Sequence, residues 1–223
     1  MTYNRTRFSF GYGLTPTIKN LMIVMGAVFL LQTLVSSRIN FYLGLVPILV
    51  WKKFFLWQLF TYIFLHGGLT HILFNLLALY MFGGELESFW GSKKFLRYFF
   101  FCGIGAAIFT VLLFGNQYML IIGASGAIYG ILLAFGWLFP NRTIYIYFLF
   151  PIPAKYFVII FGLIELYSSR AGTGGGIAHL THLGGLLFGL IYMAYPTIRQ
   201  KIRREAYRRK WTQRGPGDKN YYH

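Results

Sequence analysis

The chain has 223 residues, of which 57% are hydrophobic and only 12% are charged, against about 25% charged residues in a typical soluble domain. This composition argues against an ordinary soluble domain and predicts an all-α membrane protein. The net charge of +16 is concentrated at the ends of apolar segments and in a tail from Arg199 to Arg214. That distribution argues against nucleic-acid binding and indicates contact of the tail with anionic lipid headgroups.

The apolar segments predict one six-transmembrane-helix domain over residues 17–198, between a cytoplasmic N-terminus (residues 1–16) and a basic cytoplasmic tail (residues 199–223). About 20 apolar residues span a bilayer, and an even number of spans puts both termini on one side. The basic tail makes that side the cytoplasm, and we expect a multi-pass protein of a bacterial inner membrane. The predicted spans cover residues 17–37, 69–89, 95–114, 124–138, 155–167 and 177–195.

Two connecting segments need a separate interpretation. Residues 38–66 are rich in aromatic side chains but also contain Lys52 and Lys53, so we predict a membrane-embedded, partly helical first loop. Residues 143–154 contain Pro151 and Pro153, which break helices, so we predict an apolar loop there. A glycine-rich loop over residues 171–176 precedes the last predicted span. Cys102 is the only cysteine, which excludes an internal disulfide.

Ser125 opens the span over residues 124–138, within the sequence Gly123-Ala124-Ser125-Gly126. A serine in a membrane helix usually packs or bonds to a carbonyl, and that alternative stays open for Ser125 alone. At a helix start, however, backbone N–H groups are unpaired and could hold an oxyanion. Gly123 and Gly126 would let a neighbouring backbone approach, and Tyr129 lies one turn further on the same face. Ser125 is therefore a candidate nucleophile.

His182 lies near the start of the last span, one and two turns before Gly185 and Gly189. Such a small-residue face can press tightly against another helix, so His182 could meet Ser125 and act as its base. The alternative is that His182 only makes a hydrogen bond between helices.

His71 and Asn75 lie four residues apart and therefore on one helix face, where both could donate hydrogen bonds to a developing negative charge. They could equally form an interhelical polar clamp. A metal site built from His66, His71, His179 and His182 is not predicted, because there is no His-Glu-x-x-His motif and we expect no carboxylate near these histidines. We expect none of the carboxylates to orient His182, so a Ser–His dyad without a cofactor is predicted. The five carboxylates are Glu85, Glu87, Glu165, Glu205 and Asp218.

Together, these motifs resemble the rhomboid family of intramembrane serine proteases, over about residues 66–191. The resemblance implies that Ser125 is the nucleophile and His182 the general base. It also implies an oxyanion hole formed by His71, Asn75 and the N–H of Ser125. The motifs that carry it are His66-Gly67-Gly68-Leu69-Thr70-His71-Ile72-Leu73-Phe74-Asn75, Gly83-Gly84-Glu85-Leu86-Glu87, Gly123-Ala124-Ser125-Gly126 with Tyr129, and His182 with Gly185 and Gly189.

The resemblance further implies that Tyr129 packs on the His182 ring and that Glu87 is a structural acceptor. His179 matches no catalytic position, and we expect it to support the site. Rhomboids often carry Trp-Arg in the first loop, where this chain has Trp57-Gln58. Rhomboid substrates are typically single-span membrane proteins, cut near the outer face at small residues.

Two other functions are compatible with parts of the sequence. One is a non-catalytic rhomboid-like protein that binds client helices; such relatives usually lack the serine or the histidine, and this chain has both. The other is a small transporter that uses the same polar groups as a substrate site. The sequence has no internal repeat, and we expect no buried carboxylates; both points argue against a transporter.

Overall fold

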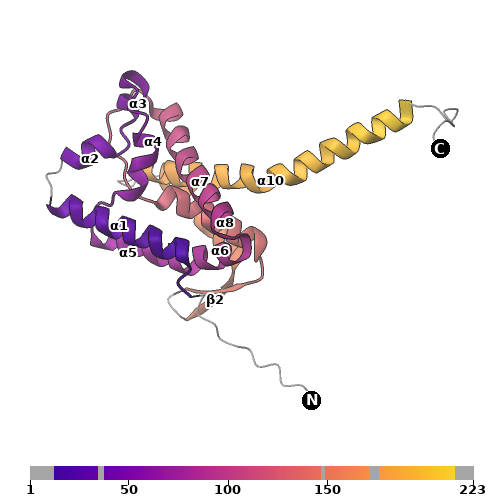
Figure 1. Cartoon of the computed structure of the whole chain (residues 1–223), viewed down its shortest axis with the longest axis horizontal. Helices are drawn as coiled ribbons and strands as arrows, with labels where there is room; N and C mark the ends of the chain where they lie inside the picture. Colours follow the sequence, from indigo (N-terminus) through magenta and orange to yellow (C-terminus); the bar gives the residue numbers. More distant parts are fainter. Residues whose placement is uncertain (1–12, 35–37, 147–148, 171–175, 214–223) are drawn as a thin grey trace, which may run out of the picture. The chain divides into compact units, whose positions relative to one another are not determined.

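The computed structural model describes residues 13–34, 38–146, 149–170 and 176–213, and it is mainly helical (Figure 1). It divides into two compact units, Met1–Leu190 and Ile191–His223. Most of the N-terminal segment, the glycine-rich loop and the side chains of the tail beyond Gln200 lie outside the described residues. The helices are α1 (Pro16–Leu34), α2 (Arg38–Leu43), α3 (Pro47–Lys53), α4 (Gln58–Thr61), η1 (Tyr62–Phe64), α5 (Leu69–Ala78), η2 (Leu79–Gly83), α6 (Gly84–Trp90), α7 (Ser92–Phe114), α8 (Ser125–Leu138), α9 (Ala154–Arg170) and α10 (Gly176–Gln213).

Three helical stretches among the described residues are long and apolar enough to cross a membrane. They are α1, the continuous stretch α5–η2–α6, and α7; α8 is a shorter apolar helix. Each coincides with a predicted span. Helix α9 is a little longer than predicted, and α10 continues as a helix well past its predicted end near Tyr195. The total of six spans stays a prediction.

Helix α8 is buried over most of its length, and its small residues let its neighbours approach closely. It packs most extensively against α7 and also contacts α9 and η2. A methyl group placed on Gly185 of α10 would lie 1.9 Å from the carbonyl oxygen of Gly126 and so would overlap it. Gly189 similarly lies against the backbone of Gly130. The predicted close approach of this glycine face to a neighbouring helix is confirmed, and it brings α10 onto α8.

Glu87 joins α6 to the start of α1. Its carboxylate accepts hydrogen bonds from the backbone N–H groups of Thr17 and Ile18, each at 3.1 Å, and from the hydroxyls of Thr15 and Ser92. The first N–H groups of a helix have no partner within the helix, and a carboxylate there also meets the positive end of the helix dipole. The expected acceptor role of Glu87 is therefore present in the structure.

The first loop, residues 38–66, is partly helical as predicted, with α2, α3, α4 and η1 in sequence. Gln58 is fully buried and holds the loop together. Its side-chain oxygen accepts the N–H of Val46 at 3.0 Å, and its amide nitrogen donates to the carbonyl of Phe41 at 3.0 Å. The indole N–H of Trp57 donates to the carbonyl of Tyr42 at 2.8 Å. A neutral amide thus anchors the loop at the position where rhomboids often carry arginine.

Replacing Gln58 with alanine should lower the free energy of unfolding by about 1–3 kcal/mol, because buried backbone groups at Val46 and Phe41 would lose their partners. Thermal unfolding in detergent measures the loss. Gln117, which is exposed, offers the matched control. Equal unfolding temperatures for the two alanine variants would show that Gln58 does not anchor the loop.

The expectation of an apolar loop at residues 143–154 is wrong in one respect. The structure has two short antiparallel strands there, β1 (Thr143–Ile146) and β2 (Phe150–Pro153), with Ile144 opposite Ile152. The fold is therefore not purely helical. Pro151 and Pro153 break a helix but are tolerated in a two-stranded ribbon, where each strand has a free edge. The β-branched residues of β1 favour an extended chain.

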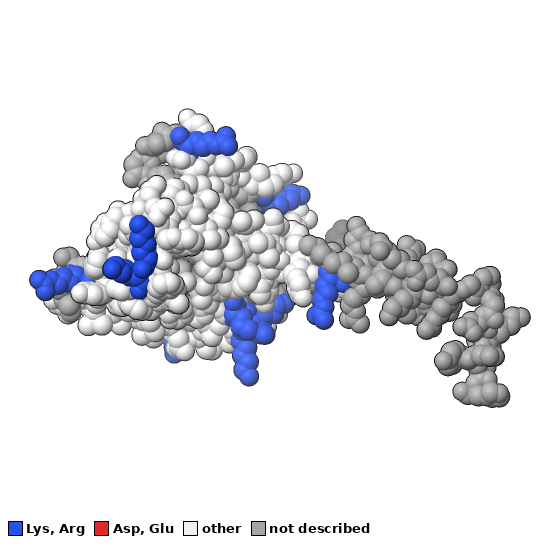
Figure 2. Space-filling model, turned by 90° about the horizontal axis from the view of Figure 1, so that it is seen from above, with Lys and Arg blue, Asp and Glu red and all other residues white. Residues whose placement is uncertain are grey.

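The surface shows few charged side chains. On the face drawn in Figure 2, scattered Lys and Arg side chains interrupt a largely uncharged surface, and no acidic side chain is visible among the described residues. The carboxylates that the structure describes, Glu85, Glu87 and Glu165, are all buried. Each has polar partners: Glu85 pairs with Arg142, and the other two accept several hydrogen bonds. Buried carboxylates of this kind need such partners.

Candidate active site

Ser125 and His182 lie within hydrogen-bond distance of one another. Ser125 is the first residue of α8 and His182 lies in the second turn of α10, and 2.7 Å separates Oγ of the serine from Nε2 of the histidine. The ring of Tyr129, one turn further along α8, stacks on the His182 ring with centroids 4.5 Å apart and planes at 11°. The close packing of Gly185 on Gly126 places the two helices at this separation.

The start of α8 offers backbone donors beside the Ser125 hydroxyl. The first intrahelical hydrogen bond runs from the N–H of Ile128 to the carbonyl of Ala124 at 3.0 Å. The N–H groups of Ser125 and the next two residues therefore have no acceptor within the helix. Gly123 precedes them with φ of +127°, a conformation that favours glycine, and its own N–H donates to the carbonyl of Tyr62.

The His71 ring and the Ser125 hydroxyl both lie near the position that a Cβ atom would take on Gly123. The point where a Cβ would stand on Gly123 is 2.8 Å from Nε2 of His71 and 3.7 Å from Oγ of Ser125. The Nδ1 atom of His71 accepts the N–H of Gly67 at 3.3 Å, so a neutral ring carries its proton on Nε2. That N–H faces the backbone at Gly123. Gly123 is therefore required by space as well as by conformation.

Asn75 is buried on α5, and its side-chain amide donates to the carbonyl of His71 at 2.7 Å. The amide nitrogen has a second N–H, which that bond leaves available. His66, at the end of the first loop, packs edge-to-face on His71 with centroids 5.2 Å apart. Burial lowers the pKa of His66 to about 4, so its ring is neutral near pH 7. Neither ring nitrogen of His66 has a hydrogen-bond partner among the described residues.

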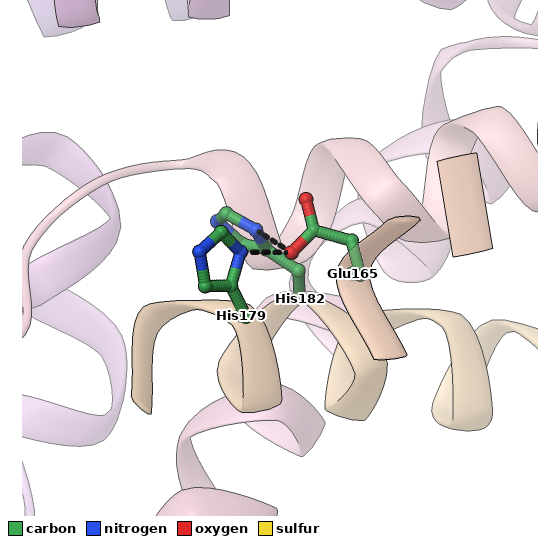
Figure 3. Close-up of side chains that lie close together, drawn as sticks. All are labelled: Glu165, His179 and His182. Carbon is green, nitrogen blue, oxygen red and sulfur yellow. Dashed lines mark hydrogen bonds and ion pairs between the residues drawn. The ribbon is translucent and has the colours of Figure 1, made fainter. Parts of the chain in front are cut away.

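A carboxylate lies next to His182, which corrects the expectation that none would. Glu165, on α9, is only 6% exposed, and its Oε2 atom is 3.1 Å from Nδ1 of His182 (Figure 3). The direction of the Nδ1–H bond does not meet hydrogen-bond geometry, so this contact is electrostatic rather than a directional bond. The same oxygen is 2.6 Å from Nδ1 of His179, and the hydroxyl of Tyr129 donates to Oε1. The predicted dyad therefore has an acidic neighbour.

The missed residue had a signal in the sequence. An acidic residue in an apolar helix is expensive in lipid and is by default a candidate functional group. Glu165 is such a residue, but the sequence does not show how α9 is rotated or that His179 and His182 face it. The reason given against a metal site, the lack of a nearby carboxylate, also fails for these two histidines. His179 itself, expected to support the site, contacts Glu165 directly.

Comparison with known proteins identifies the family of the chain. The family described as Rhomboid domain matches residues 53–199, about two thirds of the chain. The chain belongs to the rhomboid family. The matched range includes the serine, both histidines of α10, Glu165 and the anchor Gln58.

Several rhomboid proteins from other organisms are similar over the same part. Rhomboid protease GlpG of Serratia proteamaculans is 32% identical over 154 residues, which are 67% of this chain and 51% of that protein. Rhomboid protein 1, mitochondrial, of Saccharomyces cerevisiae is 30% identical over 153 residues, 66% of this chain and 43% of that protein. RHOMBOID-like protein 1 of Arabidopsis thaliana is 31% identical over 155 residues, 66% of this chain and 37% of that protein. The chain thus spans about half of these relatives' length or less.

Proposed function

We propose that this rhomboid is an intramembrane serine endopeptidase that cleaves transmembrane helices of single-span proteins near the outer membrane face. The single observation that carries the proposal is the 2.7 Å contact between Oγ of Ser125 and Nε2 of His182 at the start of a helix. Membership of a family whose relatives include named proteases supports it. Six transmembrane helices, cytoplasmic termini and a bacterial inner membrane belong to the same proposal.

In the proposed reaction, the hydroxyl of Ser125 attacks the carbonyl carbon of the scissile peptide bond. Nε2 of His182 accepts the hydroxyl proton and later donates it to the leaving amine. Water then hydrolyses the acyl-enzyme with His182 again as the base. This sequence requires that the neutral His182 carry its ring proton on Nδ1, which is the nitrogen that faces Glu165.

The oxyanion of each tetrahedral intermediate would be stabilised by the N–H of Ser125, Nε2–H of His71 and the second amide N–H of Asn75. Three features support these roles: the unpaired start of α8, the tautomer that Gly67 imposes on His71, and the hydrogen bond that orients Asn75. Removing one such donor typically lowers kcat by about 10²- to 10³-fold.

Glu165 would act through His182 rather than on the substrate. Proton transfer makes His182 a cation, and a carboxylate oxygen 3.1 Å from its Nδ1 stabilises that cation in a half-buried site. Tyr129 holds this carboxylate through its hydroxyl and holds the imidazole through its ring. Glu165 is therefore a positioning residue that extends the dyad toward a triad.

Glu165→Gln should lower kcat by about 10- to 100-fold, which corresponds to about 1.4–2.7 kcal/mol of lost transition-state stabilisation, with little change in KM. The amide keeps the shape of the side chain and an acceptor for Tyr129 but loses the charge. Kinetics of cleavage of a fluorogenic membrane peptide in detergent, with a chelator present, measure both constants. A larger effect on KM than on kcat would assign Glu165 to substrate binding or to packing instead.

The proposed function is tested by covalent labelling of the nucleophile. A fluorophosphonate probe should modify Ser125 in the folded protein, as mapped by mass spectrometry, and heat-unfolded protein should stay unlabelled. In proteoliposomes, the same preparation should cleave a tagged single-span substrate into two fragments. A protein that captures the substrate without labelling or cleavage would be a non-catalytic client-binding rhomboid.

A further inference from the structure

Three potential metal ligands, one of them on His182, lie close together on the side of the His182 ring that faces away from Ser125. Nδ1 of His179, Nδ1 of His182 and a carboxylate oxygen of Glu165 all lie within 4.8 Å of one another (Figure 3). The two histidines are one turn apart on α10, and the carboxylate reaches them from α9. Nδ1 of His182 is buried and has no hydrogen bond of acceptable geometry among the described residues. A buried ring nitrogen without such a bond, aimed at two other ligands, is the observation that points to a bound cation.

We propose that His179, His182 and Glu165 form a binding site for a divalent transition-metal ion such as Zn²⁺. Two imidazoles and one carboxylate are a ligand set that zinc uses, with water in the fourth position. In this structure the contacts of both histidines with Glu165 are direct.

The two separations between the histidines and Glu165 fit such an ion with a small adjustment. Ligand atoms about 2.0–2.2 Å from zinc lie roughly 3.3–3.5 Å apart in a tetrahedron. The separation of Glu165 Oε2 from His182 Nδ1 is 3.1 Å, already close to this value. His179 Nδ1, at 2.6 Å from the same oxygen, has to withdraw by less than about 1 Å. Its side chain is 26% exposed and lies in the first turn of α10, so the movement disturbs little packing.

The surroundings support the ligands from outside. The hydroxyl of Tyr129 donates to Oε1 of Glu165 and leaves Oε2 for the ion. Nε2 of His182 bonds to Ser125, which fixes the orientation of the ring. Hydrogen bonds of this kind to the far side of each ligand are usual in protein metal sites. The side chains of His179 and His182 are 26% and 19% exposed, so solvent reaches part of each histidine.

Metal binding has a direct consequence for the proposed protease. A neutral imidazole bound to metal through Nδ1 carries its proton on Nε2. His182 would then donate to the Ser125 hydroxyl and could not accept its proton. Zinc is therefore expected to inhibit cleavage reversibly. This inhibition rests on the proposed function, whereas binding of the ion does not.

Binding is tested on the untagged wild-type protein in detergent without substrate, so that the hydrogen bond between Ser125 and His182 is kept. Titration with Co²⁺ should give one equivalent of bound ion with the visible absorbance of a tetrahedral site, displaced by Zn²⁺. Glu165→Gln and His179→Ala, on different helices, should each weaken binding by at least about 10-fold. Circular dichroism and gel filtration verify their folding. His71→Gln is the control, since His66 and His71 are the competing histidine pair, and it should bind as the parent does.

Inhibition is tested separately, as the ratio of the cleavage rate with Zn²⁺ to the rate with a chelator. This ratio should be low for the wild type and close to one for His179→Ala. Binding without any proteolysis would overturn the proposed function and leave the metal site standing. Proteolysis with no bound ion, or binding lost only in His71→Gln, would overturn the metal site.

Discussion

Ser125→Ala should lower kcat for substrate cleavage by about 10⁴- to 10⁶-fold while the protein stays folded and binds its substrate. The residue is half-buried at the first position of α8, and its hydroxyl bonds to His182. Loss of the oxygen removes the attacking atom and leaves the oxyanion donors and the neighbouring packing unchanged. Cleavage of a tagged single-span protein in proteoliposomes, followed over hours, measures the rate, and crosslinking measures binding.

The matched control is Ser169→Ala on α9, whose hydroxyl bonds only to the carbonyl of Leu166 in its own helix among the described residues. This variant should cleave at the wild-type rate. Undiminished cleavage by Ser125→Ala would reject the nucleophile, and with it the mechanism. Undiminished binding together with absent cleavage in the wild type would favour the client-binding alternative.

Gly185→Ala should lower the free energy of unfolding by about 3 kcal/mol or more, and cleavage should fall with it. The added methyl group would overlap the carbonyl oxygen of Gly126, a backbone atom that no rotamer change can move. Relief requires α10 to move away from α8, and this movement separates His182 from Ser125. Thermal unfolding in detergent and the cleavage rate at a temperature where the variant is folded measure the two effects.

Gly26→Ala on α1 provides the comparison, because no atom lies within 4 Å of the position that its Cβ would take. Alanine is the better helix former, so this variant should be unchanged or slightly more stable. Equal stability of the two variants would show that α10 does not contact α8 at Gly185 and Gly126. The 2.7 Å contact between Ser125 and His182 would then lack the helix packing that supports it.

The helices that carry Ser125, His71 and Asn75 follow from the sequence to a large extent. Uninterrupted apolar segments predict α1, α5–α6, α7 and α8 to within a few residues, because length and hydropathy decide whether a segment can span a membrane. The contact between α8 and α10 was also predictable, since Gly185 and Gly189 share one face with His182. Both predictions use only local sequence spacing.

Other parts depend on information that spacing does not contain. Whether Glu165 faces the site depends on the rotation of α9 about its own axis, and an apolar helix in lipid gives little sign of that rotation. The hairpin of β1 and β2 depends on pairing between Ile144 and Ile152, which the prolines of the second strand conceal. Gln58 stands where rhomboids often carry arginine, and its side chain makes hydrogen bonds with three backbone groups of the first loop. These bonds are visible only in three dimensions.

Tyr129 contacts the His182 ring and the Glu165 carboxylate with different parts of one side chain. Its ring lies flat on His182 and its hydroxyl holds Glu165, so the aromatic ring acts as a rigid spacer with only two rotatable bonds. Phenylalanine at this position would keep the ring contact with His182 but lose the hydrogen bond to Glu165. A flexible polar residue could keep the hydrogen bond to Glu165 but would lose the ring contact with His182. Few amino acids satisfy both contacts, and the tolerance of position 129 to substitution is accordingly narrow.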